Sequence, residues 1–139
     1  MKFFPVLLAL LLPLAALPAA GQQAADVPTL QVPPGGATVT GQVAASGRNV
    51  YYVPATGLQA LSVSIASPGN NAVFQVYDTG ALVGGTPTAA VITGKTLPNA
   101  GARDASMAWM GVIPQTGLYL IAVDGKGGPA SYTLTVQLQ

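Results

Sequence analysis

The chain has little charge and lacks three residue types altogether. Only 6% of its 139 residues are charged, whereas an ordinary soluble domain has about 25%. It contains no histidine, cysteine or glutamate. These absences exclude disulfides, thiolate and imidazole metal sites, histidine-dependent serine or cysteine catalysis, and acid–base pairs built on glutamate. We therefore predict that the protein is not an enzyme and uses no metal and no cofactor.

What the chain does contain is aliphatic residues and residues that favour turns. Hydrophobic residues make up 50% of it, aromatic residues only 6%, and there are 17 glycines and 12 prolines. A chain this apolar is not intrinsically disordered. Strong helix formers are few, and glycine or proline recurs too often for a long helix. The composition therefore indicates a folded domain of short, turn-separated elements.

An apolar segment opens the sequence. Lys2 precedes a run of aliphatic residues and prolines from Val6 to Leu17, and small residues follow up to Gly21. This order is typical of a secretory signal peptide. The run is shorter than the roughly 20 residues that span a bilayer, and prolines interrupt it. We predict a signal peptide over residues 1–21, cleaved near Gly21, a periplasmic or secreted protein, and no transmembrane segment after cleavage.

Four cations and four aspartates remain after that cleavage, so the side-chain charge of the mature chain is zero. The cations are Arg48, Lys95, Arg103 and Lys126. Binding to nucleic acid requires clustered lysine and arginine that displace counterions from phosphates, and four scattered cations form no such cluster. The same argument disfavours electrostatic docking on anionic membranes. We therefore expect a protein partner and no nucleic acid.

Hydrophobic residues alternate with polar ones in several short segments. The clearest case is residues 131–138, where Tyr132, Leu134 and Val136 alternate with serine, threonine and glutamine. Such alternation predicts a half-buried β-strand. Residues 71–77 and 118–123 are more continuously apolar and suit central strands covered on both faces.

About eight short strands are expected in all. They lie at residues 37–43, 49–53, 61–65, 71–77, 88–93, 107–113, 118–123 and 131–138. This number of strands in a chain of this length predicts an all-β antiparallel β-sandwich with a jelly-roll-like arrangement. We expect an N-terminal extension over residues 22–36 and the sandwich domain over 37–139.

One short pattern occurs twice. Residues 53–58 read Val-Pro-Ala-Thr-Gly-Leu, and residues 113–118 read Ile-Pro-Gln-Thr-Gly-Leu. In both, proline lacks the N–H that a strand ladder uses, and Thr-Gly favours a reversal of the chain. The two copies are either similar but independent turns or equivalent corners, one for each sheet of a pseudo-repeated sandwich.

These patterns resemble a known family. The run Tyr51-Tyr52-Val53-Pro54-Ala55-Thr56-Gly57, the strand 61–65, Val76-Tyr77-Asp78-Thr79-Gly80, the run 113–119 and the closing strand 132–136 are similar in order and spacing to the bacterial pre-peptidase C-terminal domain. Members of that family are β-sandwiches, usually appended to exported enzymes. A signal peptide followed by one such sandwich is similar to the periplasmic inhibitors of g-type lysozyme. The resemblance implies an exported, non-enzymatic protein that inserts loops into the cleft of a g-type lysozyme or another cell-wall hydrolase. The alternative is a structural or accessory envelope module without inhibitory activity.

Six residues are candidates for contact with such a partner. They are Arg48, Tyr51, Lys95, Arg103, Asp104 and Lys126. Adjacent residues in a strand point to opposite faces, and the resemblance implies that Tyr52 is buried with Val50 while Tyr51 faces outward near Arg48. An ordinary exposed tyrosine is the simpler interpretation of Tyr51.

The remaining candidates lie in connections between strands. Residues 94–105 form a long segment of weak periodicity that holds Lys95, Arg103 and Asp104, and such segments are either functional or merely solvated loops. Lys126 is the one cation of the connection between the last two strands. Trp109, beside two methionines, is a core residue or an interface anchor, and its burial distinguishes the two.

Overall fold

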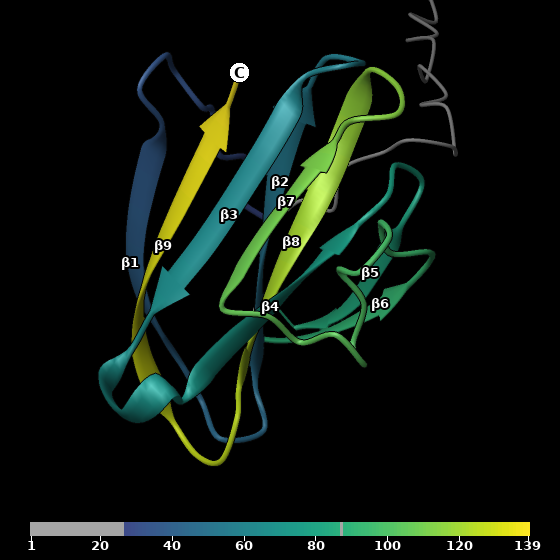
Figure 1. Ribbon diagram of the computed structural model, residues 1–139. Coiled ribbons are helices and arrows are strands. Elements are labelled where there is room, and N and C mark those ends of the chain that lie inside the picture. Colours follow the sequence, from purple (N-terminus) through teal and green to yellow (C-terminus); the bar gives the residue numbers. More distant parts are fainter. Residues whose placement is uncertain (1–26, 87) are drawn as a thin grey trace, which may run out of the picture.

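Two sheets pack face to face in a computed structural model that describes residues 27–86 and 88–139 (Figure 1). The predicted signal peptide at 1–21 lies outside the described residues. One sheet has four strands in the order β1–β9–β3–β7, and the other has five in the order β4–β8–β2–β6–β5. The strands are β1 (Ala37–Val43), β2 (Arg48–Ala55), β3 (Ala60–Ala66), β4 (Ala72–Tyr77), β5 (Leu82–Thr86), β6 (Ala89–Thr93), β7 (Ala108–Val112), β8 (Gly117–Gly125) and β9 (Ala130–Leu138).

Pairing among these nine strands is antiparallel apart from one parallel pair between β2 and β6, so the predicted antiparallel sandwich is confirmed. A further parallel bridge joins Thr29, before β1, to Tyr52 of β2. Pro68–Asn70 forms a 3₁₀ turn between β3 and β4. No helix in the described ranges is long and apolar enough to cross a membrane.

Strand β5 is the element that the periodicity did not predict. Its sequence, Leu-Val-Gly-Gly-Thr, is exposed along most of its length. Gly85 has a positive φ of 76°, and glycine inside a strand weakens any strand signal. The hydrogen-bonded pairing with β6 holds this segment in an extended conformation although its own sequence does not favour a strand.

The two continuously apolar strands have different positions in the five-stranded sheet. Strand β8 is central, and its residues 119–123 are all buried. Strand β4 is buried throughout but lies at the edge, so its predicted central position is wrong. A loop covers it instead: the N–H of Val76 donates to the carbonyl of Ala100 at 3.0 Å, and the N–H of Leu97 donates to the carbonyl of Val76 at 3.0 Å. The loop thus replaces a neighbouring strand.

The sandwich has two hydrophobic clusters rather than one. The larger lies between the sheets and includes Leu61, Phe74 and Tyr119. The smaller lies on the outer face of the five-stranded sheet and includes Tyr52 and Leu120. The β5–β6 hairpin contributes to this second cluster, as does Val27 from the segment before β1. Both faces of the five-stranded sheet are therefore covered.

The repeated pattern forms two adjacent corners at one end of the sandwich. Residues 53–58 lead from β2 in one sheet to β3 in the other, and residues 113–118 lead from β7 back to β8. The corners contact each other, because the N–H of Gly57 donates to Oγ1 of Thr116 at 3.0 Å. This arrangement agrees with equivalent corners that connect the sheets in opposite directions. Pro54 lies inside β2, opposite Leu118, rather than ending the strand.

Candidate protein-binding site

Three connections meet at the end of the sandwich opposite the corners. They are residues 44–47 between β1 and β2, 67–71 between β3 and β4, and 126–129 between β8 and β9. We call this end of the sandwich the three-turn end. The N–H of Lys126 donates to the carbonyl of Asn71 at 2.6 Å, which ties two of the turns together. Loops that a rigid scaffold positions side by side are a common place for binding.

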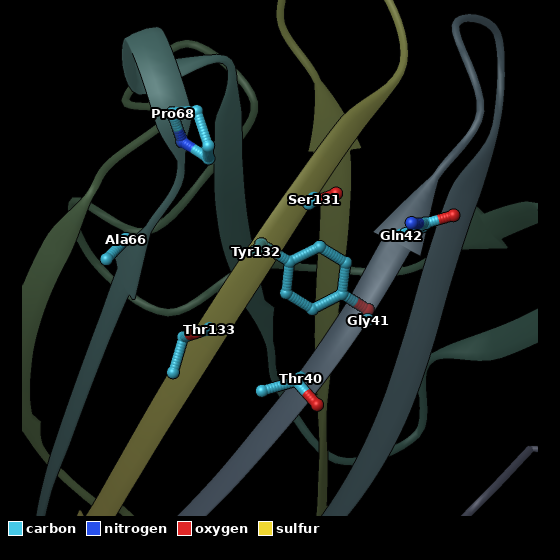
Figure 2. Close-up of a pocket in the computed structure, with 8 residues that line it drawn as sticks. All are labelled: Thr40, Gly41, Gln42, Ala66, Pro68, Ser131, Tyr132 and Thr133. Atoms are coloured by element: carbon cyan, nitrogen blue, oxygen red, sulfur yellow. The ribbon is translucent and has the colours of Figure 1, made fainter.

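Tyr132, near this end, connects the two sheets through its hydroxyl group. The ring of Tyr132 extends from β9 across β1 at Gly41 (Figure 2). A Cβ at Gly41 would lie 2.6 Å from the Tyr132 hydroxyl oxygen, so only glycine leaves room for the ring. That hydroxyl is hydrogen-bonded to the hydroxyl of Tyr51 and accepts a bond from Nδ2 of Asn49 at 3.0 Å. Nδ2 of Asn49 also donates to the carbonyl of Gln42 at 2.8 Å. The network links the two sheets.

Two hollows adjoin this network. One, of about 420 Å³, lies over β1 and β9 and reaches Pro68. The other, of about 490 Å³, lies between the ends of these strands and the start of β2. Gln42 and Ser131 line both. The full lining is Thr40, Gly41, Gln42, Val43, Ala44, Asn49, Ala66, Pro68, Thr88, Pro129, Ala130, Ser131, Tyr132 and Thr133. None of these side chains is charged, so the hollows suit neutral groups that form hydrogen bonds.

Arg48 is engaged in an ion pair within the protein. Its Nε lies 2.7 Å from Oδ1 of Asp124, and its Nη2 lies 3.2 Å from Oδ2. Such two-point geometry joins β2 to β8 in a fixed orientation. The hydrogen bond to Asp124 raises the pKa of Arg48, against the opposing effect of burial. Arg48 therefore lies beside the three-turn end and holds β2 against β8, and the carboxylate of Asp124 neutralises its charge.

Tyr51 does not face outward near Arg48, and this part of the prediction is wrong. Its side chain is half-buried, packs against the cluster between the sheets and bonds to Tyr132. Burial, reinforced by the bond to Tyr132, raises the pKa of Tyr51 well above its ordinary value. Tyr52 and Val50 are buried together as expected, but in the outer cluster. The alternation along β2 was predicted correctly, whereas the assignment of its faces was not, because both faces of this sheet are covered.

Arg103 and Asp104 belong to the loop that lies along the edge of β4 away from β8. Both are exposed. Oδ2 of Asp104 accepts a hydrogen bond from the N–H of Gly101 at 3.3 Å, and the Asp104 carbonyl accepts one from Oγ of Ser106 at 2.9 Å. The loop then pairs with β4 through Ser106 and Phe74. Asp104 therefore shapes the loop that covers β4, and Arg103 is exposed on this loop.

Lys95 lies near the corner end, away from Lys126. Its carbonyl accepts a hydrogen bond from the N–H of Asp78, which directly follows β4. Asn71, which is bonded to Lys126, precedes the other end of the same strand. The length of β4 thus separates the two lysines. The structure brings Arg48 and Lys126 to one end, and it does not gather the six predicted residues on one surface.

Trp109 lies at the margin of the core and is partly exposed. It is half-buried against the cluster between the sheets, and its Nε1 donates to the carbonyl of Pro98 at 3.0 Å. The neighbouring Met110 is 72% exposed.

The lining of the hollows was not identified from the sequence, because serine, threonine and glutamine on alternating strands carry no distinctive signal. In chemical terms the site offers hydrogen bonds and shape, and no group of three or more carboxylates occurs in the described ranges.

Comparison with known proteins supports the fold. No protein-family model matches the chain, and no curated protein matches it. Among solved structures it is similar to Aeromonas hydrophila PliG, a periplasmic lysozyme inhibitor of g-type lysozyme, with a TM-score of 0.58 and 24% identity over 81% of this chain and 97% of that one. PliG of Salmonella Typhimurium matches with a TM-score of 0.51 and 16% identity over 80% of this chain and 97% of that one. A mutant of the Escherichia coli inhibitor matches with a TM-score of 0.51 and 16% identity over 81% and 99%.

Proposed function

We propose that this chain is an exported, non-enzymatic protein that binds and inhibits a g-type lysozyme. The observation that carries the proposal is the likeness to PliG proteins, which extends over nearly the whole length of those inhibitors. The matches cover 97–99% of those inhibitors and 80–81% of this chain. The periplasmic location of those proteins agrees with the signal peptide proposed from the sequence.

The three-turn end is the surface that we propose for contact with the lysozyme. Three connections from both sheets converge there, and the bond between Lys126 and Asn71 fixes two of them. Preorganised loops lose little conformational entropy on binding. Lys126 is exposed and makes no ion pair within the described ranges, so it is free to pair with a carboxylate. Glycoside hydrolases generally carry two carboxylates beside the bond that they cleave.

The test is an inhibition assay with the full chain, exported to the periplasm of a host and purified. Lysis of peptidoglycan by a g-type lysozyme should fall to near zero at about one equivalent of the protein, as expected for tight binding. A c-type lysozyme serves as the control enzyme and should remain active. No inhibition, together with no complex on gel filtration, would overturn the proposal and favour a structural envelope module.

A matched pair of variants tests the surface. Lys126→Glu should weaken inhibition about tenfold or more, because a carboxylate would repel the carboxylates of the lysozyme cleft. Lys95→Glu, the same substitution near the corner end, should leave inhibition unchanged. If only the Lys95 variant loses inhibition, the contact surface lies at the corner end.

A further inference from the structure

Strand β7 is an edge strand with unpaired backbone groups. It is the last strand of the four-stranded sheet. The flanking bonds to β3 involve odd-numbered residues, since Ile65 donates to the carbonyl of Met107 and Ile113 donates to the carbonyl of Gln59. Backbone direction alternates along an antiparallel strand, so the N–H and C=O of Ala108, Met110 and Val112 point away from β3. No hydrogen bond in the described ranges reaches these groups.

The side chains of this edge are apolar and exposed. Met110 is 72% and Val112 64% exposed. Strand β7 contains no charge and no proline, which are the usual means by which proteins protect a free edge. An edge of this kind is a template for another β-strand.

The other three edges differ from β7 in features that make pairing with another strand less favourable. The loop that holds Leu97 and Ala100 covers β4 through backbone bonds. Strand β1, like β7, contains no charge and no proline, but its exposed side chains are polar rather than apolar, and the carbonyl of Gln42 is bonded to Asn49. Strand β5 is interrupted by glycine with positive φ. The contrast singles out β7 as an edge that is open to pairing.

We propose that β7 pairs with β7 of a second copy of this chain, antiparallel about a two-fold axis at Met110. Met110 then lies opposite the second copy's Met110, and Ala108 lies opposite the second copy's Val112. Three facing pairs that each exchange two backbone bonds would form about six hydrogen bonds. The two four-stranded sheets become one continuous sheet with an apolar seam of methionine and valine.

The charge distribution favours a second copy as the occupant. Strands β1, β9, β3 and β7 contain no charged residue, so two copies of this sheet meet without repulsion across the axis. One five-residue seam buries on the order of a few hundred Å², well below the roughly 1,200–2,000 Å² of a stable interface. The dimer is therefore weak and forms at high protein concentration. This inference does not depend on lysozyme binding.

Cysteine cross-linking tests the register. The chain has no cysteine, so Met110→Cys introduces a single thiol. The proposed pairing places the two Cα atoms about 5.5 Å apart, within the range for a disulfide. Mild oxidation should convert most of this variant to a covalent dimer. Ser131→Cys, exposed on the same sheet but on the inner strand β9, should remain monomeric. Equal cross-linking of both variants, or of neither, would overturn the proposal.

Sedimentation of the unmodified chain tests the association itself. The average mass should rise toward that of a dimer as the concentration approaches about 1 mM, because so small an interface supports only weak association. Met110→Lys should remain monomeric at every concentration, because the axis places two lysines opposite each other, whereas Ser131→Lys should behave as the unmodified chain. A monomer throughout for the unmodified chain would exclude the dimer. Met110→Lys should inhibit lysozyme as before, so the two proposals fail independently.

Discussion

Gln75 is a buried polar side chain in the hydrophobic interior of the five-stranded sheet. It is 1% exposed, and its Oε1 has no hydrogen-bond partner in the described ranges. A buried acceptor without a partner costs about 1–3 kcal/mol. We therefore predict that Gln75→Leu, which has a similar volume, raises the free energy of unfolding by about 1 kcal/mol in urea titrations.

Gln59 is the matched control for this change. Its Oε1 accepts a hydrogen bond from the N–H of Thr56 at 2.7 Å. Gln59→Leu removes a bond that is made, so it should lower the free energy of unfolding by about 1 kcal/mol. Stabilisation by both substitutions would show that general hydrophobicity, and not the unpaired acceptor of Gln75, is responsible.

The buried tyrosines predict how stability depends on alkaline pH. Burial raises the pKa of Tyr51, and it also raises the pKa of Tyr119. A raised folded-state pKa favours the protonated phenol, so this contribution to stability is fully present below the unfolded-state pKa of about 10. It is lost as the pH rises above that value. The free energy of unfolding should be flat from about pH 8 to pH 9 and fall above about pH 10.

Tyr51→Phe isolates one of these contributions. The variant should show a shallower fall above about pH 10, because one phenol fewer ionises on unfolding. Tyr119 remains and continues to contribute to the slope; its hydroxyl donates to the carbonyl of Gln115 at 2.6 Å. The measurement is chemical unfolding at a series of pH values. An unchanged slope in Tyr51→Phe would contradict the assignment to Tyr51.

At the scale of elements, the loop over β4 is a structural part of the sandwich. Leu97 is 3% exposed and belongs to the cluster between the sheets. Leu97→Ala should lower the free energy of unfolding by about 2–5 kcal/mol, the usual range for a buried leucine. It should also speed hydrogen exchange at the Val76 amide, which is bonded to this loop.

Leu82 on β5 is the control for that prediction. It is 63% exposed, and Leu82→Ala should change the free energy of unfolding by less than about 0.5 kcal/mol. A small effect for both leucines would mean that the loop does not contribute to the core, and the covered edge of β4 would then need another explanation.

Local sequence patterns predict some of these strands and miss others. The alternation in 131–138 and in 61–65 predicts strands that the structure contains as β9 and β3. The pattern does not find β5, whose glycines carry no alternation and whose order depends on pairing with β6. Nor does it give the edge position of β4, because a continuous apolar run reports that both faces are buried without saying whether a strand or a loop lies alongside.

The candidate site was predictable only in part. The cations were easily identified, since there are few of them. The pairing of Arg48 with Asp124, residues that are 76 positions apart in the chain, required the register of β2 against β8. The uncharged lining of the two hollows is formed by strands and turns distant in sequence, so no local pattern marks it.

At the scale of the whole molecule, the lack of charge predicts how binding responds to salt. The predicted mature chain is neutral, and the hollows contain no charged side chain. Association should therefore be driven by short-range complementarity rather than by long-range attraction. Apart from the one ion pair proposed for Lys126, no electrostatic attraction contributes, so the dissociation constant of a lysozyme complex should rise by less than about tenfold between about 50 and 500 mM salt, as measured by calorimetry. A change of two orders of magnitude would contradict this prediction.

The sequence by itself determined the fold class and the range of chemistry open to this protein. Period-two alternation arises from the geometry of a single strand, and the absence of histidine, cysteine and glutamate is a property of composition, so both are independent of tertiary contacts. Only the tertiary structure decided that Tyr51 points between the sheets, that Arg48 is neutralised by Asp124 and that β7 has an open edge. These features depend on which distant segments pair and on what covers each face of a sheet. Alternation specifies which residues share a face, and only the packing of the whole chain specifies what that face contacts.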